Sequence, residues 1–573
     1  MARSFTHLRL TCYPQAVGID PGLRPPAIQF IPVASMVVSQ FPISADVRIA
    51  SLGERCLAGL RRSAVVPVRS ALLLVLLVAV TLVQAQTLHR GLGPAPDSLD
   101  PHRAQSLSAI NVLRDLHEGL VSFDARAELI PGLAEHWAVS EDGLRWTFWL
   151  REEARWSDGS PLTADDVVAG WRRLLDPATA SPQAALLDRV RSAIEIRNGR
   201  LPPERLGIEA LSQHQLRVHL QRPTAWLAEL LTQPATFPWP GDGARRYSGP
   251  FVLADQVPGA HLHLLANQEW HAADQVRLEA VRWHVIEEPT VELNRYRAGE
   301  LHITETIPPS RLDWLREQFR AELRIAPYLG SFFLSFNLAR SPFRDQPDLR
   351  RALSLAIDRD LLTERVLGSG ELPAERLIPP GMPGWPGRYE AQDVDMEARR
   401  AQARELYRSA GYSTREPLTV ELRVNTSLAH RRMSAAVAAM WREHLGVRTR
   451  QVSEEWKVFV ANRRHGRLTQ IVRGGWIADW RDPANFLQLF VSDSPLNYSF
   501  FSDPTFDELM QEAALDIGPD RQARLLEAEQ RVLDAQVIIP LYYYVSRHLV
   551  KPEVRGFEDN LMDVHLSRWL ELE

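Results

Sequence analysis

One segment in the second half of the chain constrains the fold more than any other, because it changes from one periodicity to another and back. Apolar residues occupy every second position over 418–424, the pattern of a half-buried strand. Over 433–445 they recur at helical spacing up to Gly446, and 447–452 is again typical of a strand. This order predicts a βαβ unit, in which parallel strands carry ligand groups beyond their carboxyl ends. The predicted fold class is therefore α/β.

Far upstream, a short apolar run marks the chain for export. The run spans residues 71–83, follows three arginines and ends in a small-residue cleavage pattern. It is shorter than the roughly 18–20 residues that a membrane-spanning helix needs. We therefore expect a signal peptide that is cleaved after Ala85, so that residues 1–85, an upstream extension plus the signal peptide, are removed.

Composition after the cleavage point limits the chemistry of the mature protein. Residues 1–85 carry 8 of the 66 basic and 3 of the 71 acidic residues, so 58 and 68 remain and the net charge is −10. Both cysteines, Cys12 and Cys56, precede the cleavage point, which excludes a disulfide framework, thiol chemistry and a lipid-anchor cysteine. An acidic chain without a basic stripe gives no support for nucleic-acid binding. A chain of 573 residues exceeds one core and predicts two or three lobes in a soluble, periplasmic protein.

A cluster of charges and aromatic rings follows a predicted strand over 468–472. The sequence R-G-G-W-I-A-D-W begins at Arg473 and includes Trp476 and Asp479, a set of groups suited to a small zwitterion. His430 falls at the N-terminus of the predicted helix, where backbone amides and the helix dipole attract an anion. Each of these residues also has a structural interpretation, because core tryptophans, surface arginines and solvated histidines are common.

Two other segments have well-defined local signals. Residues 144–150 alternate like a strand, and Thr163 is placed to cap a helix whose first turn contains Asp165 and Asp166. Acidic residues are favoured at this end of a helix by the dipole, so we interpret the pair as structural and not as catalytic carboxylates. Apolar spacing over 349–366 predicts one further helix.

Several spaced motifs occur in a fixed order along the chain. They are L-R-E-E-A-R-W-S-D-G-S-P-L-T-A-D-D-V (150–167), R-A-G-E (297–300), P-F-R-D-Q-P-D-L-R-R-A-L-S-L-A-I-D-R-D (342–360), S-A-G-Y (409–412) and I-P-L-Y-Y-Y-V (539–545). With them the chain resembles the peptide class (family 5) of ABC-importer substrate-binding proteins, over essentially all of residues 87–573. The segment V-R-G-G-W-I-A-D-W (472–480) is most similar to the oligopeptide binders of that class.

The resemblance implies a two-lobed periplasmic binding protein fold of the cluster C type, with three domains and a hinge. Domain I would be discontinuous, comprising residues 86–117, 236–330 and 546–573, with domain II at 118–235 and domain III at 331–545. In such proteins an extended peptide lies between the lobes as an added strand. Main-chain hydrogen bonds then supply affinity, and roomy hydrated pockets tolerate many side chains.

The resemblance also implies roles for individual residues. Asp479 matches the aspartate that pairs with the α-ammonium group of the peptide, a partner that a desolvated ammonium requires. The remaining matched residues are the aromatic walls Trp456 and Trp476, the cations Arg473, His430 and one of Arg463 or Arg464 for the α-carboxylate, Tyr544 beside the N-terminal half of the peptide, and Gln105, Ser106 and Leu107 along the peptide backbone. Leu367 stands near where oligopeptide binders can carry a lysine, so the resemblance does not fix the preferred peptide length.

The expected function is the capture of an oligopeptide and its delivery to the permease subunits of an ABC importer, by a monomer without catalytic residues, cofactor or metal. Two alternatives stay open. In the first, the protein belongs to the same importer family but binds a modified or non-peptide ligand, such as a cell-wall peptide. Less favoured is an exported hydrolase, because the sequence contains no G-x-S-x-G or H-E-x-x-H motif and the mature chain has no cysteine.

Overall fold

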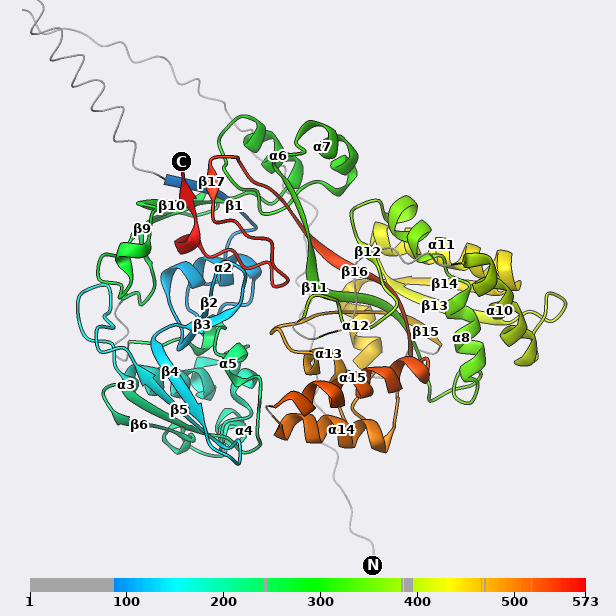
Figure 1. The fold of residues 1–573 in the computed structure, drawn as a ribbon, viewed down its shortest axis with the longest axis horizontal. Coiled ribbons are helices and arrows are strands. Elements are labelled where there is room, and N and C mark those ends of the chain that lie inside the picture. Colours follow the sequence, from blue (N-terminus) through cyan, green and yellow to red (C-terminus); the bar gives the residue numbers. More distant parts are fainter. Residues whose placement is uncertain are drawn as a thin grey trace, which may run out of the picture. The chain divides into compact units, whose positions relative to one another are not determined.

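A computed structural model describes the part of the chain that follows the predicted cleavage point (Figure 1). The described residues are 87–240, 245–382, 385, 395–464, 466–467, 470–516 and 518–573. The predicted signal peptide lies outside them. No helix of the described residues is long and apolar enough to cross a membrane.

A four-stranded sheet contains the first strand of the described residues. Its order is β1-β10-β9-β8, and β1 pairs with β10 in parallel. The strands are β1 (Thr87–Gly93), β8 (Phe251–Val257), β9 (His261–Ala266) and β10 (Ala280–Val285). Nearby elements are α2 (Leu107–Leu116), α6 (Pro289–Arg297), α7 (Leu312–Gln318), β17 (Val554–Arg555) and β18 (Glu571–Leu572). The core of this region unites Leu88, Trp283 and Leu570, so segments from the beginning, middle and end of the described residues share one core.

A second four-stranded sheet, in the order β4-β5-β7-β6, lies within residues 121–231. The elements here are β2 (Val121–Phe123), β3 (Leu129–Pro131), β4 (Ala134–Val139), β5 (Arg145–Leu150), α3 (Ala164–Leu175), α4 (Ala193–Arg197), β6 (Ile208–Ser212), β7 (Gln215–His219) and α5 (Leu227–Leu230). The predicted strand at 144–150 and the helix after Thr163 are confirmed. The main-chain N–H of Thr163 donates to the Asp166 carboxylate at 2.8 Å, which explains an acid in this turn without catalysis.

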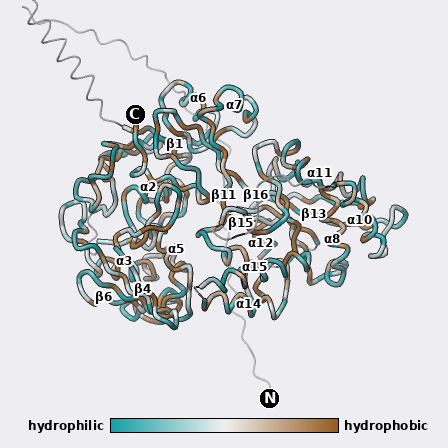
Figure 2. The backbone as a smooth tube through the Cα atoms, in the orientation of Figure 1, coloured by the Kyte–Doolittle hydropathy of each residue, from teal (hydrophilic) through white to brown (hydrophobic). Residues whose placement is uncertain are grey.

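The largest sheet has six strands in the order β12-β16-β11-β15-β13-β14. Its strands are β11 (Leu323–Phe336), β12 (Leu372–Pro373), β13 (Thr419–Asn425), β14 (Arg448–Glu454), β15 (Ile471–Ile477) and β16 (Ile538–Leu549). The helices around it are α8 (Pro347–Leu355), α9 (Arg359–Leu361), α10 (Met396–Ser409), α11 (Leu428–Leu445), α12 (Trp456–Arg464), α13 (Ala484–Leu487), α14 (Pro504–Leu515) and α15 (Pro519–Asp534). Figure 2 shows hydrophobic residues along β11 and β13, whose side chains belong to one buried cluster.

The predicted βαβ unit is confirmed in this sheet. β13 and β14 pair in parallel from Thr419 with Arg448 to Asn425 with Glu454, and α11 connects them. The helix ends at Gly446, whose φ of 80° is a conformation that a side chain makes unfavourable. Asn425 and His430 therefore lie at the carboxyl end of β13, on the side predicted to hold ligand groups.

Two predicted boundaries are wrong. The segment 349–366 is not one helix, because α8 ends at Leu355 and a new turn begins where the Asp358 carboxylate accepts the N–H of Leu361 at 3.0 Å. The buried guanidinium of Arg359, which donates to the carbonyl oxygens of Ala374 and Pro540, fixes this break. Apolar spacing alone does not detect such a bend, since both pieces keep the same buried face.

The strand predicted at 468–472 is also displaced, because β15 spans Ile471–Ile477 and part of the predicted range lies outside the described residues. Arg473 and Trp476 therefore lie on the strand itself, and Asp479 follows its end.

Two long antiparallel strands, β11 and β16, connect the first sheet region with the six-stranded sheet (Figure 1). Their register runs from Leu323 with Leu549 to Ser335 with Ile538, and it shifts between Pro327 and Ser331. Beyond β16, Val550 bridges to Ile303, which in turn bridges to Arg90 of β1. A second, smaller shift follows between Phe332 and Phe333, so the strand pair is irregular where it passes from one sheet to the other.

Candidate functional site

The carboxyl end of β13 and the middle of β15 bring two predicted cations together. Nε of Arg473 donates to Oδ1 of Asn425 at 2.9 Å, and the same oxygen lies 2.7 Å from Nδ1 of His430. One amide oxygen therefore orients both side chains. The sequence did not indicate this bridging role of Asn425, although its position at the end of a predicted strand was a usable signal.

Arg473 is a buried cation surrounded by aromatic rings. The residue is only 9% exposed. Its guanidinium carbon lies 5.1 Å from the ring centre of Trp456 and 5.7 Å from that of Phe332. No carboxylate among the described residues forms an ion pair with it. Burial lowers the pKa of Arg473 from its usual value. Cation–π contacts compensate only part of the desolvation of a guanidinium, so this site favours an added anion.

His430 adds a group that is neutral at physiological pH. Burial and the charge of Arg473 lower the pKa of His430 to about 4. Its ring centre lies 5.0 Å from that of Phe332. The site therefore offers one permanent positive charge and one imidazole that gains a proton only if an anion joins the cluster.

The helix α12 contributes the next group of predicted residues. The guanidinium of Arg463 lies 4.5 Å from the ring centre of Tyr498, and Arg463 lines the same cavity as Arg473. Trp456, at the beginning of the helix, is 46% exposed and stacks on Phe459 with ring centres 6.0 Å apart. The sequence left Arg463 and Arg464 as alternatives, and the structure places Arg463 beside Arg473, whereas the side chain of Arg464 is outside the described part.

A small apolar cavity lies next to this cationic cluster. Its volume is about 60 Å³, and its walls include Phe333, Trp476 and Phe490. The indole Nε1 of Trp476 donates to Oδ1 of Asn485 at 2.6 Å, which fixes the ring. Gly474 is required here because a Cβ atom at this position would overlap the ring of Phe333. The predicted role of Trp476 as a pocket wall fits this geometry.

Tyr544 enters the same region from β16. Its ring packs against Gly330, and its hydroxyl oxygen would lie 3.1 Å from a Cβ atom at Gly475. Burial raises the pKa of Tyr544, so its hydroxyl keeps its proton and can act as a hydrogen-bond donor. Strands β11, β15 and β16 thus bring Tyr544, Arg473 and Trp476 to one site.

Asp479 carries the negative charge of the segment that begins at Arg473. Its carboxylate makes no hydrogen bond or ion pair with any residue that the structure describes. The side chain is open to solvent, yet the surrounding protein desolvates it enough to raise its pKa. Its main-chain oxygen accepts a hydrogen bond from Nε2 of Gln233 at 2.8 Å. Asp479 is therefore held in place by its backbone while its charge stays without a partner.

Unlike the side chain of Asp479, those of the next two residues have partners among the described residues. Arg481 donates two hydrogen bonds to the carboxylate of Glu128, at 2.6 and 2.5 Å, and lies 3.9 Å from a carboxylate oxygen of Glu229. Trp480 stacks on Trp226 with ring centres 6.5 Å apart and an angle of 5° between the planes. These contacts join the segment after β15 to residues 128–229.

The predicted main-chain partners at residues 105–107 have local interactions of their own. The Asp97 carboxylate accepts the N–H groups of Gln105 at 2.9 Å and of Ser106 at 3.1 Å. Ser106 caps α2 by accepting the N–H of Ala109, and Leu107 is 53% exposed. That this segment pairs with a peptide backbone stays a prediction. Because the N–H groups of Gln105 and Ser106 already bind Asp97, other main-chain groups of the segment would have to contact the peptide.

Comparison with known proteins shows the family. The sequence profile of the family described as bacterial extracellular solute-binding proteins, family 5 middle, matches residues 128–498. The chain belongs to this family.

Curated relatives of this family 5 chain match over most of its length. The periplasmic murein peptide-binding protein MppA of Escherichia coli is 35% identical over 503 residues, which cover 85% of this chain and 93% of the relative. The periplasmic oligopeptide-binding protein OppA of E. coli is 35% identical, with 83% and 91% covered. The probable deoxycholate-binding periplasmic protein YgiS of E. coli is 33% identical, with 81% and 89% covered.

Solved structures of the family confirm the predicted α/β, two-lobed periplasmic binding protein fold. The unliganded open form of MppA superposes with a TM-score of 0.79 at 34% identity, covering 85% of this chain and 98% of the other. Haemophilus influenzae OppA in complex with the peptide RPPGFSPFR gives a TM-score of 0.66 at 30% identity, with 85% and 99% covered. The expected membership in the peptide class of importer-binding proteins is likewise confirmed.

Proposed function

We propose that this family 5 protein is a periplasmic receptor that binds oligopeptides as zwitterions and delivers them to the permease subunits of an ABC importer. One observation carries the proposal. Arg473 and Asp479 are charged groups of opposite sign on one segment, and neither is neutralised by a described residue. The α-carboxylate and the α-ammonium of a free peptide supply both missing counter-charges.

The spacing of the two charges agrees with a short peptide. Strand residues rise about 3.3 Å each, so the backbone positions of Arg473 and Asp479 are at most about 20 Å apart. An extended peptide of three to five residues spans about 10–18 Å, and the two side chains reach towards it. The apolar cavity at Trp476 offers one place for a peptide side chain, and we assign Trp456 and Tyr544 to further aromatic walls. Longer peptides would use Arg463 or His430 in place of Arg473.

The proposed receptor closes around its ligand by bending at the β11–β16 crossing. The boundaries that we propose, after residues 330 and 545, fall where the register of this strand pair shifts, between Pro327 and Ser331 opposite Val545 and Tyr543. This irregular point supports a hinge there. Domain I then comprises residues 86–117, 236–330 and 546–573, with domain II at 118–235 and domain III at 331–545. A peptide favours closure only as far as it binds the closed state more tightly.

A second candidate is a modified or non-peptide ligand. It is favoured by the range of relatives at similar identity, which includes proteins named for murein peptide and for deoxycholate. A bile acid carries a carboxylate but no ammonium group. A ligand of that kind would use Arg473 and leave Asp479 without a function, whereas a cell-wall peptide would still place an ammonium at Asp479 and would differ in the groups that meet His430 and Arg473.

Calorimetric titration of the ligand-stripped mature chain, residues 86–573, tests the proposal. We expect tri-, tetra- and pentapeptides to bind, and both N-acetylation and Asp479→Asn to weaken binding at least about 30-fold, since breaking a desolvated charge pair costs about 2–5 kcal/mol. Asp313→Asn is the matched control, because the side chain of Asp313 is 92% exposed on α7. Equal affinity for acetylated peptides would transfer the assignment to the second candidate. Peptide cleavage detected by mass spectrometry would instead indicate a hydrolase.

A further inference from the structure

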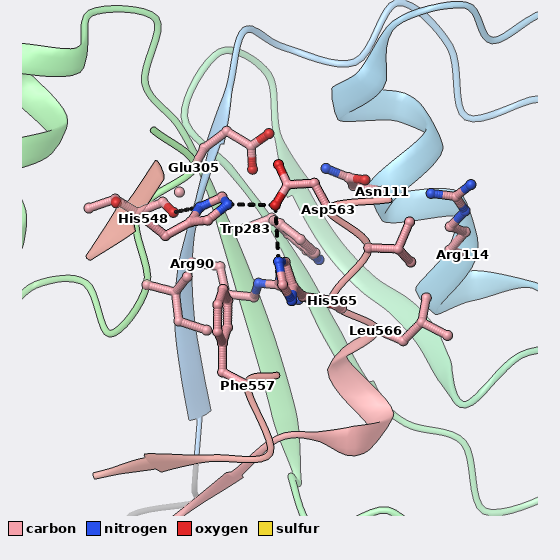
Figure 3. Close-up of a pocket in the computed structure, with 14 residues that line it drawn as sticks. Arg90, Asn111, Arg114, Trp283, Glu305, His548, Phe557, Asp563, His565 and Leu566 are labelled. Atoms are coloured by element: carbon pink, nitrogen blue, oxygen red, sulfur yellow. Dashed lines mark hydrogen bonds and ion pairs between the residues drawn. The ribbon is translucent and has the colours of Figure 1, made fainter. Parts of the chain in front are cut away.

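A compact group of side chains that can bind a metal lies where β16 meets the C-terminal tail. Among the described residues, His548, Asp563 and His565 each offer a ligand atom, and these atoms all lie within 4.8 Å of one another. Nε2 of His548 is 2.8 Å, and Nε2 of His565 is 3.1 Å, from Oδ1 of Asp563. Figure 3 shows both imidazole rings directed at the same carboxylate.

These distances are close to those between the ligands of one metal ion. Zinc binds imidazole nitrogen and carboxylate oxygen at about 2.0–2.2 Å in tetrahedral sites, so neighbouring ligand atoms are about 3.3 Å apart. The observed separations of 2.8 and 3.1 Å are shorter by a few tenths of an ångström. Small side-chain movements would therefore admit an ion between the three groups.

The surroundings fix the orientation that a metal-binding histidine needs. Nδ1 of His548 donates to the carbonyl oxygen of Thr304 at 2.9 Å, which leaves Nε2 as the nitrogen that faces the cluster. A hydrogen bond of this kind is the usual outer partner of a metal-ligating imidazole. The ring of His565 stacks on Phe557 with ring centres 3.9 Å apart. Both imidazoles are thus oriented before any ion binds.

A cavity at the cluster supplies space and a fourth ligand. Its volume is about 20 Å³, and it is lined by Glu305 together with the three residues. This is room for about one water-sized particle. The carboxylate of Glu305 makes no hydrogen bond to a described residue, and Figure 3 shows it beside that of Asp563. When an ion binds, the proton between Nε2 of His548 and Asp563 is released, and two carboxylates and two neutral imidazoles then balance the charge of a divalent cation.

Two arginines, Arg90 and Arg114, also line the cavity, and the charge of Arg90 is directed elsewhere. The guanidinium of Arg90 donates to the carbonyl oxygen of His565 at 2.7 Å and to Oγ of Ser567 at 2.9 Å, and it stacks over Trp283 at 4.1 Å. These contacts direct the guanidinium towards the tail backbone and the indole ring. Arg90 therefore braces the loop that carries Asp563 and His565.

We propose that His548, Asp563, His565 and Glu305 bind one divalent ion of the zinc class. Imidazole with carboxylate selects zinc and its transition-metal neighbours, whereas calcium and magnesium prefer oxygen ligands throughout. Four protein ligands leave no open position, so the ion is structural. It connects the C-terminal tail to the end of β16 and to the segment at residue 305, next to the strand pair that joins the two sheets.

Another histidine group is a poorer metal site and serves as the control. His89 and His284 are 2.9 Å apart between Nδ1 and Nε2, but Nδ1 of His302 already accepts the main-chain N–H of His89. His263 lies in the same sheet, opposite Arg282. If zinc binds this surface and not the proposed site, His263→Gln should weaken binding.

The test uses the mature chain, residues 86–573, stripped with a chelator and titrated with Co²⁺ and then with Zn²⁺. We expect one ion per chain, the visible absorption of four-coordinate Co²⁺, displacement by Zn²⁺ but not by Mg²⁺, and a higher Tm with zinc. His565→Gln should weaken zinc binding at least tenfold and remove the Tm increase, with Asp563→Asn as a second variant. Circular dichroism checks that each variant folds.

Three results would overturn the proposal. They are the absence of a Co²⁺ spectrum in the unmodified chain, equal zinc affinity in the unmodified chain and in folded His565→Gln, and loss of the ion in His263→Gln. The first result does not depend on any variant. Peptide affinity is measured on the same samples, so failure of this proposal is distinguishable from failure of the peptide-binding function.

Discussion

Two arginines at opposite ends of one segment, Arg473 on β15 and Arg481 after it, have opposite environments. Arg481 is paired with Glu128 and lies near Glu229, and the hydrogen bonds that it donates to Glu128 raise its pKa. Arg473 has only an amide oxygen and aromatic rings as partners among the described residues, and burial lowers its pKa. A neutralised arginine serves the fold, whereas one that is buried without a counter-charge is a candidate for ligand binding.

The largest effect that tests this contrast is on peptide affinity. We expect Arg473→Met to weaken the binding of tripeptides about 100-fold, because the peptide α-carboxylate would lose its charged partner, worth about 3 kcal/mol. The free energy of unfolding should stay the same or increase, since an unpaired buried charge is removed. Calorimetry and urea titration measure the two quantities. A variant that loses stability but keeps its affinity would contradict the contrast.

The second effect is on stability and concerns the other arginine. Arg481→Met leaves the buried Glu229 carboxyl and the half-exposed Glu128 without their cation, so we expect a loss of about 1–2 kcal/mol in the free energy of unfolding. Peptide affinity should change much less than in Arg473→Met. Chemical denaturation of both variants in parallel provides the measurement, and Arg316→Met, at an exposed i,i+3 pair on α7, is the control.

The smallest effect is a pH dependence at His430. Its pKa is about 4 in the folded protein, below the ordinary value of 6.5, so its contribution to stability is present above pH 6.5 and is lost as the pH falls towards 4. When the pH is lowered from 7 to 5, we expect the free energy of unfolding to fall by about 1 kcal/mol less in His430→Gln than in the unmodified chain.

In Arg473→Met the free energy of unfolding should also fall less between pH 7 and pH 5, because the charge of Arg473 is one cause of the lowered pKa of His430. Urea titrations at the two pH values measure it. An identical pH dependence in the unmodified chain and in His430→Gln would show that the imidazole is solvated in the folded state.

Much of the local structure and the family could be predicted from the sequence, because these features are written in consecutive residues. Alternation over 418–424 and the glycine at 446 indicated the βαβ unit, and the motifs around 150–167 and 342–360 indicated the family. The break after α8 could not be predicted in this way. It depends on Arg359, whose hydrogen-bond acceptor at Pro540 is distant in the sequence.

The candidate site was predicted in part for the same reason. Arg473, Trp476 and Asp479 lie close together in the sequence, so their types alone suggested a zwitterion site. Asn425 became visible only through its contacts with Arg473 and His430. The proposed metal site at His548, Asp563 and His565 was not predicted from the sequence either. One ligand is on a strand and the other two are in a tail, and this spacing matches no compact motif.

The paired glycines at the centre of β15 have a consequence for ligand selection. A side chain at Gly474 would displace Phe333, and one at Gly475 would approach the hydroxyl of Tyr544 and the guanidinium of Arg473. The lack of a side chain at Gly474 and Gly475 therefore sets the width of the cavity, although neither residue carries a charge that would bind the peptide. We expect alanine at Gly475 to narrow the range of accepted side chains and to displace the guanidinium of Arg473 slightly, so a single added methyl group would change both the space and the charge that a ligand meets.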